Sequence, residues 1–256
     1  MLDAQFGLLR RYAEGCHWPV YLATEKPDEY HIQLIAKKYN VTILPLKQEH
    51  SDFLESRVAA MDTLPPTVQY VLPLQEDFLL ERPGINEGAL KDALELFDSN
   101  HLIQSIRLMP CPGSSARQPF VGPWKQLQVN DLCFSYQATL WRRSTYRDYL
   151  FRLIRRCQEE YPHYQPCTPE WNQFAVRNNP AETHIGLSLL ERMFPQAIHL
   201  CWSRKASWAN AVYWCPWPYR PTAIVKGVLE PWAAELIRRE GFAINVNPQT
   251  ASHGSA

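Results

Sequence analysis

The chain has 256 residues, of which 46% are hydrophobic, so it can bury a substantial core, and its length fits one large domain. Lysine plus arginine and aspartate plus glutamate balance at 26 each, so no net charge draws the protein to nucleic acid or to an anionic membrane. Any binding must come from a local site, and we expect no nucleic-acid partner.

The cysteines and the first residues indicate the compartment. Seven cysteines without a C-x-x-C pair argue against a zinc ribbon, a thioredoxin-type motif or a complete disulfide framework. The first 15 residues carry charges from position 3, and nowhere does an apolar run reach about 18 residues. We therefore expect reduced thiols, no signal peptide, no membrane span and a cytoplasmic location.

The first part of the chain alternates helix and strand patterns. Phe6, Leu8, Leu9 and Tyr12 share one face of a predicted first helix, and residues 18–25 have the pattern of a short buried strand. Further helices are predicted over residues 29–39, 52–64 and 86–100, and further strands over residues 41–46, 68–83 and 102–110. This alternation implies an α/β fold whose central, mostly parallel sheet is flanked by helices.

The second part begins with a predicted long loop over residues 111–129 and then returns to regular elements. Strands are predicted over 131–143, 197–203 and 222–227, and helices over 144–161, 181–194 and 230–241, with Ser144 as the N-cap of the first. An aromatic loop covers 208–221, and residues 247–256 form a polar tail that we expect to be disordered. Because no linker divides the chain, residues 1–246 are predicted to form one domain.

Two adjacent acids, Glu76 and Asp77, follow an apolar run that reads as a buried strand. In open α/β sheets ligands bind beyond the carboxyl ends of the strands, where carboxylates can hold a hard divalent ion together with phosphate oxygens. The alternative is that Asp77 starts a turn while Glu76 is solvated. The two residues alone leave both interpretations open.

Several segments in order along the chain resemble glycosyltransferases of the GT-A fold, in particular glycosyltransferase-like proteins of bacterial and viral polysaccharide loci. They are residues 18–25, the Glu-Asp-Phe block at 76–78, Ile-Arg-Leu at 106–108, and residues 135–146 and 224–242. The resemblance implies a Rossmann-like GT-A domain, with residues 1–110 as its nucleotide-sugar half and 111–246 as its acceptor half. It also implies a divalent cofactor, Mn²⁺ or Mg²⁺, that bridges the donor diphosphate.

The resemblance also implies which residues bind the donor: Thr24, Glu25, Glu76, Asp77 and Arg107. Because neighbouring strand residues point to opposite faces, Asp77 is predicted to be the metal ligand and Glu76 a helper that faces away. Arg107 could instead pair with a loop carboxylate for structural reasons. A GT-A domain opens with a strand whereas this chain opens with a predicted helix, which leaves open whether another segment fills the place beside residues 18–25.

The acceptor side is predicted from residue types that suit sugars. Gln137 could reach a sugar hydroxyl while Trp141 offers a flat apolar face, although Trp141 could equally be core and Gln137 a loop cap. Glu170 begins a short predicted helix and is the candidate general base, with Glu182 as its rival; a helix-start charge is the alternative for Glu170. His184 and His199 are weaker candidates for a further metal ligand.

The resemblance therefore implies a metal-dependent glycosyltransferase that moves a sugar from a nucleoside-diphosphate sugar to a hydroxyl of a glycan or small-molecule acceptor, in surface polysaccharide synthesis. A nucleotidyltransferase is an alternative, although the chain has no Gly-rich phosphate loop. A second alternative is a non-catalytic carbohydrate-binding protein, since nine tryptophans could form an aromatic platform.

Overall fold

The structure is a computed structural model and describes residues 1–47, 52–110, 119–128, 131–165, 168–202, 215–220, 222–225 and 227–243. Its helices are α1 (Leu2–Tyr12), α2 (Tyr30–Tyr39), α3 (Glu55–Thr63), α4 (Glu87–Ser99), α5 (Arg143–Glu160), α6 (Pro169–Asn178), the 3-10 helix η1 (Pro180–Glu182), α7 (His184–Met193) and α9 (Pro231–Arg239). Its strands are β1 (Tyr21–Thr24), β2 (Thr42–Pro45), β3 (Tyr70–Val71), β4 (Leu79–Leu80), β5 (Ile103–Arg107), β6 (Trp124–Gln126), β7 (Thr139–Arg142), β8 (Ile198–Trp202), β9 (Tyr219–Arg220), β10 (Ile224–Val225) and β11 (Val228–Leu229).

A five-stranded sheet in the order β3-β7-β5-β8-β6 forms the centre of the fold. The predicted α/β class is confirmed, but this sheet is mixed rather than mostly parallel. β5 and β8 are parallel, whereas β7 is antiparallel to both of its neighbours and β6 is antiparallel to β8. Parallel neighbours need a crossover connection, which is usually a helix. Between β5 and β7 the helix-strand alternation stops, and no helix separates β6 from β7 in the part of the chain that the structure describes.

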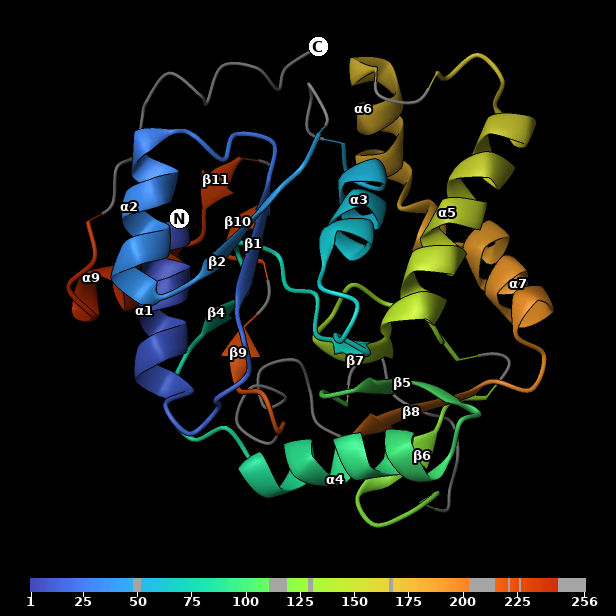
Figure 1. Cartoon of the computed structure of the whole chain (residues 1–256), viewed down its shortest axis with the longest axis horizontal. Coiled ribbons are helices and arrows are strands. Elements are labelled where there is room, and N and C mark those ends of the chain that lie inside the picture. Colours follow the sequence, from blue (N-terminus) through green and yellow to red (C-terminus); the bar gives the residue numbers. More distant parts are fainter. Residues whose placement is uncertain are drawn as a thin grey trace.

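Helices cover both faces of this sheet. α4 lies against one face, while α5 lies against the other with α3 and α7 beside it (Figure 1). Two hydrophobic clusters result: Phe97 of α4 and Ile106 of β5 belong to one, and Leu150 of α5 and Met61 of α3 belong to the other. The sheet draws strands from both predicted halves of the chain, since β3 and β5 precede residue 110 and the other three follow it.

Outside the central sheet the strands form three short pairs. β1 and β2 are parallel and lie beside α1 and α2, whereas β4 with β9 and β10 with β11 are antiparallel (Figure 1). The expected helix faces are confirmed where Phe6 and Leu8 of α1 and Ile32 and Ala36 of α2 are buried. In the described part of the chain, no helix combines the length and apolar composition that crossing a bilayer requires.

The strand predicted over residues 68–83 is wrong. β3 ends at Val71 and β4 begins at Leu79, and the two strands belong to different sheets. Pro73 lies between them, and because its nitrogen carries no hydrogen it cannot donate to a ladder. The chain instead turns at Gln75, whose carbonyl oxygen accepts a hydrogen bond of 3.1 Å from the N–H of Phe78.

Other boundaries also differ from the prediction. Only β7 remains of the strand over 131–143, and α5 is N-capped by Arg142, so Ser144 lies inside the helix rather than at its cap. The predicted loop over 111–129 contains β6. Residues 111–118 of that loop, residues 208–214 of the aromatic loop and the tail 247–256 lie outside the described residues.

Two adjacent arginines fasten the helices to the sheet. The Arg143 guanidinium donates hydrogen bonds of 2.7–3.3 Å to four carbonyl oxygens in residues 61–68, at the end of α3. Arg142 donates to three carbonyl oxygens in residues 97–103, at the end of α4. The last carbonyl groups of a helix lack intrahelical hydrogen-bond partners and carry partial negative charge. A cationic side chain at this end donates the missing hydrogen bonds and offsets the charge.

The Arg143→Met variant should lower the free energy of unfolding by about 2–5 kcal/mol, because it leaves several partly buried carbonyl oxygens without donors. Arg147→Met is the matched control on the same helix, since it removes the exposed ion pair to Asp62, 2.9 Å long, and should cost less than about 1 kcal/mol. Urea denaturation measures both. Equal losses for the two variants would contradict the structural role of Arg143.

A candidate ligand-binding cleft

A cleft of about 1290 Å³ separates β1 and β2 from a wall made by α3 and by residues 67–76, 78, 135–137 and 139–141. Among the described strands β1 pairs only with β2, and residues 18–25 line the cleft. The place beside this segment is therefore open rather than filled by another described strand. Pockets for drug-sized ligands typically have volumes of about 300–1,000 Å³, so the cleft can accommodate a molecule as large as a nucleotide sugar.

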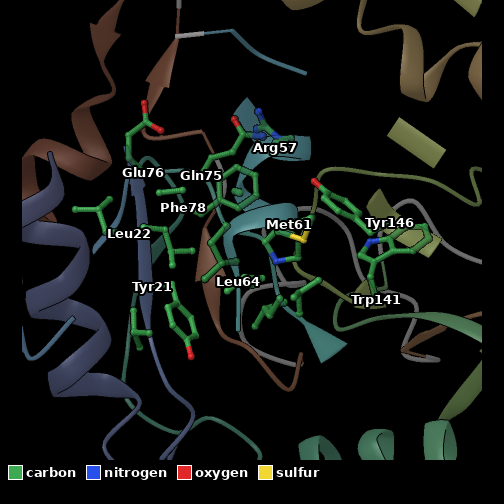
Figure 2. Close-up of a pocket in the computed structure, with 18 of the residues that line it drawn as sticks. Tyr21, Leu22, Arg57, Met61, Leu64, Gln75, Glu76, Phe78, Trp141 and Tyr146 are labelled. Carbon is green, nitrogen blue, oxygen red and sulfur yellow. The ribbon is translucent and has the colours of Figure 1, made fainter. Parts of the chain in front are cut away.

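The inner part of the cleft is apolar. Leu22 of β1 faces Met61 of α3 and Leu64, which follows α3, across it, and Trp141 and Tyr146 form the far wall in this view (Figure 2). Leu22 packs with one hydrophobic cluster, whereas Met61 and Leu64 belong to another. The cleft thus runs between two separate hydrophobic clusters. Polar contacts to a bound ligand must come from other parts of the cleft lining.

Arg57 places a positive charge on the cleft. Arg57, Gln75 and Glu76 lie toward one end of the cleft, away from Leu64 and Tyr21 (Figure 2). The guanidinium of Arg57 lies 4.2 Å from the ring centre of Phe53 and 5.0 Å from that of Tyr136, and it donates to the Phe53 carbonyl oxygen at 2.5 Å. A cation held over two rings at a cleft is a suitable partner for a phosphate group.

Sequence reasoning missed Arg57. The signal available was its spacing of four residues from Phe53, which lets the two side chains meet on one helix face. The contribution of Tyr136 could not be inferred, because that residue comes from a segment far along the chain.

Thr24 and Glu25, both predicted to bind the donor, line the cleft at the end of β1. The Thr24 hydroxyl oxygen accepts a hydrogen bond of 3.1 Å from the Lys26 N–H. The Ser56 hydroxyl donates to Glu25 Oε1 at 2.6 Å and so connects the end of β1 with α3. These two residues therefore lie on the same cleft as Arg57.

Glu76 and Asp77 lie in the turn that follows Gln75, so the alternation of a strand does not orient them. Glu76 is exposed and lines the cleft, whereas Asp77 is partly buried and is not part of the lining. Burial, followed by the charge of Glu76, raises the pKa of Asp77, while a hydrogen bond from the Ile224 backbone opposes the rise. The structure thus turns Glu76, rather than Asp77, toward the cleft.

This acid pair is chemically compatible with a divalent cation. Two adjacent carboxylates, one of them disfavoured by burial, gain from a nearby positive charge. The described residues contain no group of three or more histidine, cysteine, aspartate or glutamate side chains that could hold a metal by themselves. Glu76 and Asp77 could therefore supply at most part of a coordination sphere, and ligand oxygens or water would supply the rest.

Gln137 and Trp141 also line the cleft. Gln137 precedes β7, and its Oε1 accepts a hydrogen bond of 2.6 Å from the Tyr219 hydroxyl, so its side chain is already oriented. Trp141 is 1% exposed and packs against Phe134 at 5.2 Å between ring centres. Trp141 is thus mainly a core residue, which leaves Gln137 as the more accessible polar group on this wall.

Arg107 and the predicted bases lie away from the cleft lining. Arg107 is buried, donates to the Leu132 carbonyl oxygen, and has its pKa lowered by burial. Glu182 accepts hydrogen bonds from the Tyr136 N–H at 2.8 Å and from Asn179 Nδ2 at 2.7 Å. These contacts assign Glu182 a structural role in holding Tyr136 at the cleft.

Glu170 lies exposed in the first turn of α6, which the Thr168 side chain caps. Two turns of the same helix carry Asn172 and Val176 to the cleft. Within the described residues, no side-chain contact of the kind that holds Glu182 fixes Glu170, so Glu170 retains both predicted roles, a base beside the cleft and a helix-start charge.

The two histidines are not brought to the cleft lining. His199 is buried, and its Nδ1 lies 2.7 Å from the Ser105 hydroxyl oxygen. Burial, followed by the charge of Arg107, lowers its pKa to about 4, so it is neutral near pH 7. His184 is exposed at the start of α7.

Comparisons with known proteins add no relative. No protein-family model matches the chain. No curated protein and no solved structure is significantly similar to it. The interpretation of the cleft therefore depends on the residues that line it.

Proposed function

We propose that the cleft binds a nucleoside-diphosphate sugar and that the protein transfers the sugar to an acceptor hydroxyl. One observation carries this proposal. Thr24, Glu25 and Glu76, predicted for the donor, line the same cleft as Gln137 and Trp141, predicted for the acceptor, although more than a hundred residues separate the ends of this set. Arg57 adds the cation that a diphosphate requires.

Each polar group has a role that fits its place. Arg57 pairs with the diphosphate, and Thr24 and Glu25 contact the nucleoside part of the donor. Glu76, supported by Asp77, would hold a divalent ion, which would supply positive charge to the leaving diphosphate. Gln137 orients the acceptor. Glu170 lies outside the cleft lining, at the start of the helix that carries Asn172 and Val176 to the cleft, and we assign it the role of accepting the proton of the attacking hydroxyl.

A thermal-shift screen of nucleoside diphosphates and nucleotide sugars, with and without Mn²⁺, tests this proposal. A ligand that binds the native state raises the unfolding midpoint with its occupancy, so one diphosphate should raise it and Mn²⁺ should enhance the rise. A response to nucleoside triphosphates alone would favour a nucleotidyltransferase. A response to glycans without any nucleotide response would favour a carbohydrate-binding protein.

The Arg57→Met variant should weaken binding of the responding diphosphate by about 10–100-fold, the loss expected for one charge-assisted contact. Arg10→Met is the matched control, because Arg10 also lines the cleft but donates to the Tyr39 and Asn40 carbonyl oxygens, each at 2.7 Å. Calorimetric titration measures both affinities. Equal affinity of Arg57→Met and the parent protein would exclude Arg57 from the diphosphate site.

A further inference from the structure

Two carboxyl groups at the start of α3 each have one buried oxygen without a hydrogen-bond partner in the described part of the chain, Asp52 Oδ2 and Glu55 Oε1. Their other oxygens are occupied. Asp52 Oδ1 accepts from the N–H groups of Leu54 at 3.0 Å and Glu55 at 3.3 Å, and Glu55 Oε2 accepts from Trp171 Nε1 at 3.0 Å. Two such oxygens can bond to one another only through a proton.

A single shared proton satisfies both oxygens. Two ionised carboxylates in a buried place repel and lose hydration, whereas a protonated carboxyl donates to its neighbour and removes both penalties. Burial, followed by the hydrogen bond with Asp52, raises the pKa of Glu55 to about 8. We place the proton on Glu55, because Asp52 already accepts hydrogen bonds from the Leu54 and Glu55 N–H groups at the start of α3, whereas Glu55 accepts only one, from Trp171.

We propose that Asp52 and Glu55 share one proton and that this proton holds the first turn of α3 in the position that presents Phe53 and Arg57 to the cleft. Both are positioning residues. The Phe53 N–H donates to Asn172 Oδ1 of α6 at 2.9 Å, and Glu55 bonds to Trp171 of the same helix. The turn is thus fixed to α6 through two contacts, one of which includes the carboxyl pair.

Among the residues that the structure describes, the groups around the pair do not supply a competing cation. On α3, the Arg57 guanidinium lies over the rings of Phe53 and Tyr136. Glu25, which follows β1, faces the turn through its hydrogen bond with Ser56. From α5, the Cys157 thiol faces Glu55, and burial raises the pKa of that thiol to about 12, so it is neutral. From α6, the contacts come from the uncharged side chains of Trp171 and Asn172.

Loss of the shared proton lowers the stability of the fold as the pH rises. Because the pKa of Glu55 is about 8 in the folded protein and 4.5 in its ordinary state, the pair stabilises the fold fully below pH 4.5. That contribution declines as the pH rises toward 8 and is absent above it. Above pH 8 two charges face one another, and the first turn of α3 should move away from α6.

The Trp171 indole N–H reports the protonation of the pair directly, and its NMR signal can be followed from pH 6 to 9.5. In the parent protein the signal should shift with a midpoint near pH 8. Glu55→Gln should abolish this shift, because the amide oxygen accepts from Trp171 while the amide N–H donates to Asp52 without titrating. A signal that stays constant in the parent protein, or that titrates equally in Glu55→Gln, would overturn the shared proton.

Asp52→Asn provides a second test that does not remove Glu55. An asparagine can still cap α3, and its amide N–H can donate to an ionised Glu55. The midpoint of the Trp171 signal should therefore move well below 8. A midpoint that stays near 8 in Asp52→Asn would contradict the pairing.

The consequence for the cleft rests on the proposed function and is measured separately, with UDP and Mn²⁺ as the probe. UDP affinity should fall between pH 7.5 and 9 in the parent protein, and Glu55→Gln should restore it at pH 9. An affinity that falls equally in Glu55→Gln would overturn the positioning role. If UDP binds at no pH, a uridine donor is excluded, while the Trp171 titration still decides whether the proton is shared.

Discussion

The Glu76→Gln variant should lose the metal dependence of donor binding and reduce sugar transfer by about 10²-fold or more. Glu76 is the acid of the pair that lines the cleft, and an amide carries no net charge to match a divalent ion. Its side chain is exposed, so the fold should be unaffected. Donor affinity measured against Mn²⁺ concentration, together with the rate of transfer, tests this expectation.

Asp77→Asn is the matched control for Glu76. Because burial and the Glu76 charge raise the pKa of Asp77, the ionised form is disfavoured in the folded protein, and an amide should leave stability unchanged or slightly increased near pH 7. The loss of metal-dependent binding should be smaller than for Glu76→Gln. A larger loss for Asp77→Asn would reverse the assignment and make Asp77 the principal ligand, as the sequence pattern predicts.

The Glu170→Gln variant should lower turnover by about 10²–10⁴-fold and leave donor affinity nearly unchanged, because it removes a proton acceptor and keeps the size and polarity of the side chain. The side chain is exposed at the start of α6, so the unfolding free energy should change little. Turnover and donor affinity must be measured on the same preparation to separate the two effects.

Glu182→Gln distinguishes a base from a structural acid. Glu182 accepts two hydrogen bonds, one of them from the Tyr136 N–H, so its loss should lower the unfolding free energy by about 1–3 kcal/mol. Any decrease in the turnover of Glu182→Gln should be explained by the smaller fraction of folded protein. If Glu170→Gln turns over normally while a folded Glu182→Gln does not, the base is Glu182.

The sequence predicts the helices well because their information is local. In α1, α2 and α4, apolar residues at helical spacing are buried in the structure. Asn86 caps α4, because its side-chain oxygen accepts a hydrogen bond of 3.0 Å from the Ala89 N–H. Such periodicity and capping depend on residues within a few positions of one another. The same local signal cannot report which strand becomes the partner of another.

The strands and the site depend on distant partners, and there the sequence fails in part. β3 and β4 have two residues each and are defined by pairing with β7 and β9, which no pattern within residues 68–83 reveals. Arg142 and Arg143 bind carbonyl oxygens, which every residue possesses, so residue type gives no sign of their partners. The cleft likewise combines Arg57 with Tyr136, far apart in the chain.

One measurement tests the proposed donor site most directly: NMR line broadening by Mn²⁺ in the presence of the nucleoside diphosphate that binds. A paramagnetic ion broadens signals only from nearby nuclei, so the broadening locates the metal. The backbone signals of Gln75, Glu76 and Asp77 should broaden with both Mn²⁺ and the diphosphate present, and much less with Mn²⁺ alone. Broadening confined to another part of the chain, or diphosphate binding that leaves these signals sharp, would contradict a metal-dependent donor site in this cleft.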